Sequence, residues 1–485
     1  MHITPVWRTI LFMQEYEPTP NVFGIETEYS CLIGFPNEED PSKDKYYELV
    51  GECHAADAVD LLGYEPSRSG VEEIEDELIQ PVLKNMGLYR IIGYGLLSNG
   101  GRLYEDPSGL EYCTPETRTA QEAVLRCFDG DEIVLNLLEG LRRNEVITGY
   151  QVNRRIVDHN RTTRGVHLNT TTSNDIDCIK NSYHQDAVAT LNIVKGAIFG
   201  SGGLLINSDG ETEFHHSPRL SVSNELHCGG NKYIPLIRYP FNSDGDLSRM
   251  ETVSGDALNF GWPLRASMVV TNAVMGMLEM GYMYNFPVIT SPVETAHTVG
   301  QYGNANEVRA FDVNDECLMA KPLDILADIC ADILTADDEN QYLDDEARQV
   351  IPEIIEVIDR MNQDESSVAT QVESIARKIA IERRMSNGGY SIGSEKLCRF
   401  DYYWDKLQGG LAEDLRQNKD VGWYGFDDSH NDQKAAKQRM ITPPQDTRAK
   451  IRGEHILQTK GNSIVDWHHK GDLIGTKGYL HPLSS

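Results

Sequence analysis

Hydrophobic and polar positions along the chain follow two periods. Residues 22–29 (VFGIETEY) and 102–106 (RLYED) alternate with the period of two that is typical of a half-buried strand. A strand, a loop and a second strand are also expected within 147–169. Apolar residues at helical spacing predict helices over 71–86, 119–143, 186–198, 263–280, 366–385 and, as two helices around a polar turn, 322–361. Strands mixed with long helices indicate an α+β fold.

The strand at 102–106 follows a turn signal, Asn99-Gly100-Gly101, whose glycines accept the positive φ of a tight reversal. Because side chains alternate across a strand, Arg102, Tyr104 and Asp106 share one face. A cation, a phenol and a carboxylate do not suit a dry core. This face therefore either meets solvent or belongs to a functional site. The strand at 22–29, which also carries charged residues on one face, favours the functional site.

Glu26 and Glu28 in the first strand also share a face, because they are two residues apart. Like charges this close repel each other unless a cation lies between them. Glu111 can return to the neighbourhood of Tyr104 after a Pro-Ser-Gly turn at 107–109. Carboxylates that converge with a phenol oxygen are hard ligands of the kind that Mg²⁺ or Mn²⁺ takes, often together with nucleotide phosphates. We therefore predict a divalent metal site built from both strands.

Composition narrows the function classes. The formal net charge of −31 argues against nucleic-acid binding, which needs Lys and Arg to neutralise phosphates. No apolar run reaches about 18 residues, so no membrane span is expected. Nine cysteines without a CxxC pair indicate reduced thiols in the cytoplasm. One basic region either forms a groove for an acidic partner or is a solvated face, and its arginines are Arg142, Arg143, Arg154, Arg155, Arg161 and Arg164.

Five motifs together resemble the family of Pup ligases and depupylases. They are GIETEY, NGGRLYED, LEYCTPE, PPQDTRAKIRGE at 443–454 and VDW at 465–467. Members of this family attach the small protein Pup to lysines or remove it, and their fold is similar to that of glutamine synthetase. The resemblance implies a large glutamine synthetase-like catalytic domain over 1–410, with an antiparallel sheet cradle packed by helices. It also implies a small C-terminal domain over 411–485.

The same resemblance implies roles for the candidate site residues. The metal ligands would be Glu26, Glu28, Tyr104, Glu111, His167 and Glu251. The ATP contacts would be Arg102, Thr114, Arg219, Arg249 and Trp467. Asp106 would be the catalytic residue, as a general base in a ligase or as a nucleophile or water-positioning group in a hydrolase. Structural roles remain alternatives for the histidine and for the arginines at 219 and 249.

Two positions depart from the family pattern. Leu168 stands where the family has an acid, and Glu251 stands where it has a histidine. A carboxylate can still bind Mg²⁺, but replacing a neutral imidazole by an anion changes the charge of the site. These departures leave open whether the partner is Pup itself.

The direction of the reaction has three alternatives. As a ligase, which we predict, the chain would use ATP to phosphorylate a γ-carboxylate of a small acidic Pup-like protein. A lysine amine of a target protein would then attack the acyl phosphate. GIETEY and VDW favour this direction, whereas the long connection at 31–94 and the short spacing from Asp106 to Tyr112 favour a depupylase or deamidase. A ligase for small amino-acid or peptide carboxylates is the second alternative.

Overall fold

The computed structural model describes most of the chain, and the statements below concern this part. It covers residues 21–35, 45–48, 76–91, 95–106, 109–157, 161, 163–172, 182–207, 209–227, 235–238, 248–417, 421–460, 463–465, 469–472 and 478–479. Across these residues no helix combines the length and apolar character that a membrane crossing requires. The cysteines among them form no disulfides with one another.

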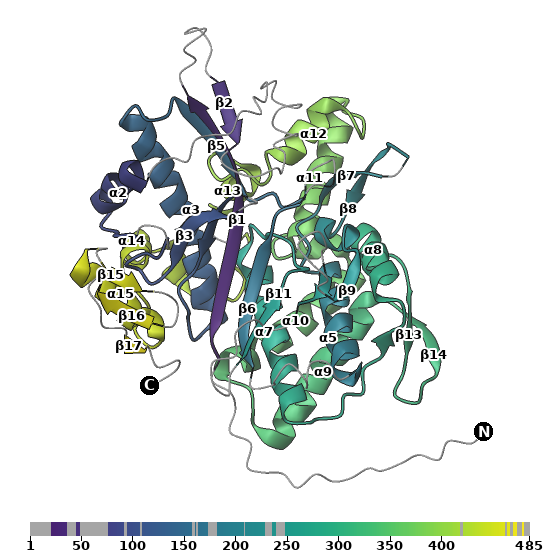
Figure 1. Cartoon of the computed structure of the whole chain (residues 1–485). Coiled ribbons are helices and arrows are strands. Elements are labelled where there is room, and N and C mark those ends of the chain that lie inside the picture. The colour runs from purple at the N-terminus through teal and green to yellow at the C-terminus, as the bar shows by residue number, and fades with distance from the viewer. Residues whose placement is uncertain are drawn as a thin grey trace.

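A seven-stranded antiparallel sheet organises the fold (Figure 1). Its main order is β11-β6-β1-β4-β3, and β2 and β5 pair with the second half of β1. The strands are β1 (Phe23–Phe35), β2 (Lys45–Glu48), β3 (Arg102–Asp106), β4 (Gly109–Cys113), β5 (Gly149–Asn153), β6 (Val166–Thr172) and β11 (Ser248–Thr252). The long strand β1 therefore contacts both halves of the sheet and connects them.

The first half of β1 shows why the sheet has two unlike faces. Phe23, Ile25 and Tyr29 are at most 2% exposed and point into the core. Glu26 and Glu28 alternate with them and project from the opposite face, as the period of two predicts. One face of this strand is therefore apolar, and the other carries the carboxylates.

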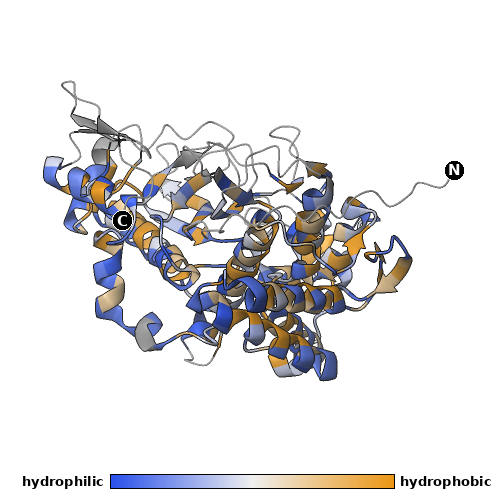
Figure 2. Ribbon diagram, turned by 90° about the horizontal axis from the view of Figure 1, so that it is seen from below, coloured by the Kyte–Doolittle hydropathy of each residue, from blue (hydrophilic) through white to orange (hydrophobic). Residues whose placement is uncertain are grey.

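Helices cover the apolar face. Helices α3 (Ala120–Arg143) and α7 (Gly261–Glu279) pack against β1 and β6 and against each other. Their buried side chains join those of the strands in one core. In Figure 2 orange, hydrophobic residues alternate with blue, hydrophilic ones along the helices. The other long helices of this layer are α5 (Ser182–Val194), α8 (Pro292–Tyr302), α9 (Pro322–Asn340), α10 (Asp345–Gln363) and α11 (Glu373–Gly388).

Shorter elements complete the described fold. The remaining helices are α2 (Asp76–Asn85), α6 (Pro218–Ser221), α12 (Glu395–Tyr402), α13 (Leu411–Arg416), α14 (Gln433–Ile441) and α15 (Arg448–Thr459), with 3₁₀ turns η1 (Lys195–Ala197), η2 (Glu365–Val368) and η3 (Asp428–Asn431). The small sheets contain β7 (Gly203–Ile206), β8 (Thr212–His215), β9 (Glu225–His227), β10 (Pro235–Ile237), β12 (Val288–Ile289), β13 (Val308–Phe311), β14 (Cys317–Ala320), β15 (Ser463–Val465), β16 (His469–Asp472) and β17 (Gly478–Tyr479).

Most predicted elements are confirmed, with one correction in detail. The strands at 22–29 and 102–106 and the helices at 119–143, 263–280 and 322–361 form as expected. The helix predicted over 366–385 begins only at Glu373, because Asp364 first caps a separate 3₁₀ turn through its contact with the Ser366 amide. The helix predicted over 71–86 appears as α2, and its first five residues lie outside the described part.

The C-terminal elements pack against helices of the seven-stranded sheet's covering layer and against the turn before β3. Helix α14 contacts α3, where the Arg439 guanidinium donates to Asp129 at 2.9 Å. In Figure 1 the yellow helix α15 lies beside α14, on the outer side of β3. Ala412 shares a buried cluster with Trp404, across the predicted domain boundary at 410. The division into 1–410 and 411–485 stays a prediction.

Candidate functional site

Strand register brings the predicted metal ligands together on the polar face of the sheet. Glu28 of β1 lies opposite Glu111 of β4, which lies opposite Tyr104 of β3. Glu26 lies opposite His167 of β6. Glu251 of β11 pairs with Asn169, two residues beyond His167. We call the six predicted ligands, Glu26, Glu28, Tyr104, Glu111, His167 and Glu251, the carboxylate cradle.

Glu26 is the central carboxylate of the cradle. Its Oε2 contacts His167 Nδ1 at 3.0 Å, and its Oε1 accepts from Asn169 Nδ2 at 3.2 Å and from Arg249 Nη1 at 2.8 Å. Burial alone would raise the pKa of Glu26, but the His167 hydrogen bond and the Arg249 charge outweigh it and lower the pKa to about 2. Glu26 is therefore an anion at neutral pH.

Glu111 is held by the phenol that the sequence places near it. Tyr104 Oη donates to Glu111 Oε2 at 2.6 Å, and the Cys113 thiol lies 3.6 Å from Glu111 Oε1. Burial and the negative charges of Glu26 and Glu28 raise the pKa of Glu111 to about 8, against the Tyr104 hydrogen bond, which lowers it. The sequence predicted repulsion between Glu26 and Glu28 within one strand, and the structure shows that both also repel Glu111 on the neighbouring strand.

Glu251 changes the cradle as the sequence departure suggests. This carboxylate is 2% exposed, and it lies 3.2 Å from His167 Nδ1 and 2.9 Å from Arg238 Nε. Burial lowers the pKa of His167, but contacts with Glu251 and Glu26 dominate and raise it to about 10. Arg238 and Arg249 compensate much of the negative charge that the glutamate adds.

Two of the predicted ATP contacts reach the cradle, and two are engaged with the backbone. Arg102 lies over the Tyr104 ring, 3.6 Å from its centroid, and Arg249 contacts Glu26. Thr114 Oγ1 instead accepts from the Ile25 amide at 2.9 Å. Arg219 donates to the carbonyl oxygens of Val253 at 3.1 Å and Arg164 at 2.8 Å.

The remaining two predicted site residues are placed incompletely. Asp106 ends β3, and its backbone pairs with Gly109, but its side chain lies outside what the structure describes. Trp467 lies outside the described residues. Their predicted roles, catalysis and nucleotide contact, stay predictions.

The cradle and the adjacent Cys113 offer two sets of three metal-ligating atoms within the described chain. One set is Glu26, His167 and Glu251, and the other is Glu26, Glu111 and Cys113, with the atoms of each set within 4.8 Å of one another. Nearby, Asn169 is 7% exposed, and its Oδ1 has no hydrogen-bond partner among the described residues. Sequence reasoning missed Cys113, although its position two residues after Glu111 signals a shared face.

Sequence reasoning also missed how two motifs contact each other. Glu116 of LEYCTPE accepts from Arg448 Nε at 2.7 Å and from Arg452 Nη1 at 3.2 Å, both in PPQDTRAKIRGE. Burial would raise the pKa of Glu116, but the two arginines lower it to about 2. Gly100, at φ 87°, allows Ala449 to approach, since an added Cβ would lie 2.9 Å from that of Ala449. Helix α15 is thereby fixed to the turn before β3.

Four of the six arginines in the basic region do not line a common groove. Arg142 and Arg143 pair with Glu139 at the exposed end of α3. Arg154 and Arg155 are buried, 1% and 8% exposed, and contact core groups. The region is therefore partly a solvated face and partly internal.

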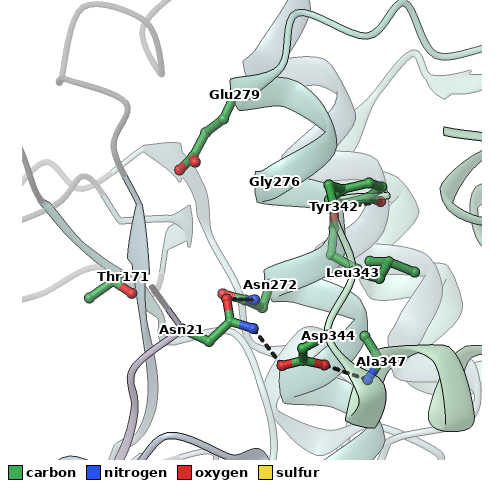
Figure 3. A pocket seen from close by; sticks show the side chains of 10 residues that line it. Asn21, Thr171, Asn272, Gly276, Glu279, Tyr342, Leu343, Asp344 and Ala347 are labelled. Atoms are coloured by element: carbon green, nitrogen blue, oxygen red, sulfur yellow. Dashed lines mark hydrogen bonds between the residues drawn. The ribbon is translucent and has the colours of Figure 1, made fainter. Parts of the chain in front are cut away.

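A polar pocket lies at the start of β1, between α7 and α10 (Figure 3). Asn21 donates to Asp344 at 2.6 Å and accepts from Asn272 at 2.8 Å, and Asp344 accepts from the Ala347 amide. These polar groups satisfy one another, and no predicted site residue lines the pocket. The pocket therefore does not change the assignment of the site.

Comparisons with known proteins agree on one family. The family model described as Pup-ligase protein matches residues 21–470. Pup–protein ligase 1 of Rhodococcus erythropolis is 22% identical over 413 residues, which cover 78% of this chain and 85% of that protein. A depupylase of Acidothermus cellulolyticus is 23% identical over 416 residues, covering 82% and 77%.

Solved structures show the same fold. The structure of the complex between the prokaryotic ubiquitin-like protein Pup and its ligase PafA matches with a TM-score of 0.73 at 17% identity, covering 96% of this chain and 90% of that one. PafA in complex with ADP matches with a TM-score of 0.67 at 18% identity, covering 87% and 93%. The predicted α+β, glutamine synthetase-like fold is confirmed. The chain belongs to the Pup-ligase family.

Proposed function

We propose that this chain is an ATP- and Mg²⁺-dependent carboxylate–amine ligase. It joins a γ-carboxylate of a small acidic Pup-like protein to a lysine amine of a target protein through an acyl phosphate. The observation that carries this proposal is the convergence of Glu26, Glu111 and Tyr104 on one sheet face, with Arg102 and Arg249 beside them. The relatives named as Pup ligases, and the fold neighbours solved with Pup and with ADP, support the same reading.

The residues of the cradle fit a hard divalent cation. Carboxylates and a phenol supply the oxygen donors that Mg²⁺ or Mn²⁺ takes with nucleotide phosphates, and the His167 imidazole lies beside them. The buried Oδ1 of Asn169, without a hydrogen-bond partner in the described chain, is one further oxygen donor. When bound, the metal supplies positive charge that neutralises the transferring phosphoryl group.

The arginines and Asp106 complete the proposed chemistry. Arg249 is 40% exposed in its side chain, so it can leave Glu26 and turn toward a phosphate oxygen. Arg102 stacks on Tyr104 beside the carboxylates and can contact the same phosphates. Asp106 accepts the proton of the incoming lysine amine, which then attacks the acyl carbon and releases phosphate. We also propose a cytoplasmic location, in keeping with the reduced cysteines.

The ligase reading is tested with purified chain, ATP, Mg²⁺, a Pup-like acidic protein ending in glutamate and a lysine-bearing protein. We expect an adduct whose mass is the sum of both proteins minus one water, with one ATP hydrolysed per bond. The Asp106→Asn variant should lose about 10²–10⁴-fold in kcat, and Asp359→Asn on α10, far along the chain, serves as control. Mass spectrometry and phosphate release measure both quantities.

The depupylase alternative has its own support in the similar depupylase from Acidothermus cellulolyticus. Cleavage of a preformed adduct with ATP bound but not consumed would favour that alternative. Ligation of free amino acids would favour the small-molecule ligase. A chain that shows no metal-dependent nucleotide binding would contradict all three enzymatic readings.

A further inference from the structure

Gly165 lies between two ligands of the cradle. Its amide donates to Glu28 Oε2 at 2.6 Å, just before β6 begins at Val166. A Cβ at this position would lie 2.6 Å from both Glu28 Oε1 and His167 Nε2, closer than a carbon atom can approach them. The backbone of Gly165 is not left-handed, so the conformation would accept another residue, but a Cβ here would have to push the ends of the Glu28 and His167 side chains aside.

The peptide unit that carries this amide is held from its other side. Arg219 Nη1 donates at 2.8 Å to the Arg164 carbonyl, which belongs to the same peptide unit as the Gly165 amide. Arg219 is itself buried and fixed, because its own amide donates to Asp256 at 2.9 Å. A hydrogen bond to the carbonyl polarises the peptide and strengthens donation from its N–H. The guanidinium of Arg219 thus acts on Glu28 through one peptide bond.

We propose that the peptide unit between Arg164 and Gly165 positions Glu28 for metal binding. Arg219 orients this unit, its N–H fixes one oxygen of Glu28, and the missing side chain leaves Glu28 Oε1 and His167 Nε2 facing the same space. Arg219 is then a positioning residue rather than a contact of the nucleotide. This inference rests on the metal-binding role proposed above.

The test uses the full chain and Mn²⁺ alone as the probe, with free Mn²⁺ followed by electron paramagnetic resonance. Gly165→Ala should raise the Mn²⁺ dissociation constant by about 10–100-fold, as the loss of a ligand-orienting contact does. Gly255→Ala is the matched control, because its Cβ would meet only Leu168 Cδ1 at 4.0 Å. Thermal unfolding without metal, followed by circular dichroism, shows whether each variant is folded.

A second background separates positioning from general damage to the fold. In Glu28→Asp the carboxylate is shorter, so adding Gly165→Ala should cost less than about threefold further, because both changes act on one contact. The proposal is overturned if Gly165→Ala binds Mn²⁺ as the wild type does. Equal losses in both backgrounds would overturn it as well. Wild-type chain that takes up no Mn²⁺ would instead refute the proposed function, and this inference with it.

Discussion

The carboxylate cradle and a buried network of arginines and aspartates both contain carboxylates and cations. They differ in how completely each carboxylate is paired with a cation. In the network, Arg377 donates to Asp401 at 2.7 Å and to Asp405 at 2.9 Å, and Arg155 donates to Asp401 at 2.9 Å. All four side chains are at most 6% exposed. Each charge of the network has an opposite charge as its neighbour.

The part of the cradle around Glu111 lacks this balance, although Glu26 and Glu251 contact His167, Arg238 and Arg249. Glu26, Glu28 and Glu111 lie on adjacent strands, and the charges of the first two raise the pKa of the third to about 8, after burial as the larger cause. Removing one partner from a balanced buried cluster destabilises the fold, whereas an excess of one sign on a converging face suits a ligand that supplies the opposite charge. The difference between the two clusters can be tested by removing one charge at a time.

The largest effect is expected in the network. Arg377→Met leaves two buried aspartates without their main partner, so the free energy of unfolding should fall by about 3–5 kcal/mol. Urea unfolding measures this loss. The matched control is Arg399→Met, whose partner Glu395 and own side chain are 63% and 43% exposed, and which should change stability by less than about 0.5 kcal/mol. Similar values for both variants would contradict the distinction between buried and exposed pairs.

Glu116 with Arg448 and Arg452 is a second cluster in which opposite charges are paired. It tests whether a carboxylate that is paired with arginines contributes to the stability of the fold. Glu116 has a pKa of about 2, below its ordinary value of 4.5, because Arg452 and Arg448 outweigh its burial. Its contribution to stability is therefore present above about pH 4.5 and is lost as the pH falls toward 2, amounting to about 3 kcal/mol at neutral pH.

Glu116→Gln removes this contribution. The difference in the free energy of unfolding between wild type and variant should narrow as the pH falls from about 6 to about 3. Chemical unfolding at each pH measures the difference. A gap that stays constant with pH would show that the carboxylate charge is not what fixes α15.

Removing a carboxylate from the cradle should leave the stability of the fold equal or higher but should lower the affinity for metal. Glu111→Gln replaces a carboxyl whose ionised form is disfavoured by burial and by Glu26 and Glu28, and keeps an acceptor for Tyr104, so the urea midpoint without metal should stay equal or rise. Mn²⁺ affinity should fall by at least about 100-fold, because even groups that only support a ligand cost 10–100-fold. Glu382→Gln, exposed on α11, is the control and should change neither quantity. A variant that is less stable and binds Mn²⁺ normally would place Glu111 with the structural carboxylates.

Much of the cradle could be predicted from the sequence, because strand alternation fixes which residues share a face. Glu26 with Glu28, and Arg102 with Tyr104, follow from a period of two alone. The partners across strands do not: Glu28 meets Glu111 through a register that depends on the whole sheet. His167 and the residue at 251 could be placed only by the family resemblance.

Two properties could not be predicted from the sequence: which charged side chains are buried, and which residues far apart in the chain form ion pairs. Arg154 and Arg155 read as members of a basic surface, yet one is paired with Asp131 and the other with Asp401 in the core. Glu116 and Arg452 are 336 residues apart, so no local pattern joins them. The hairpin of β7 and β8 has strands of four residues, too short for a period to be recognised.

The smallest effect is expected at Cys113, which lies among the cradle carboxylates without an oxygen to offer. Mg²⁺ and Mn²⁺ prefer oxygen donors over thiols. Cys113→Ser keeps a donor near Glu111 Oε1, so Mn²⁺ affinity should change by less than about threefold. Cd²⁺, which prefers sulfur, should lose more affinity than Mn²⁺ in the same variant. Equal and large losses of affinity for both ions would mean that the Cys113 thiol, and not the carboxylates alone, binds the metal.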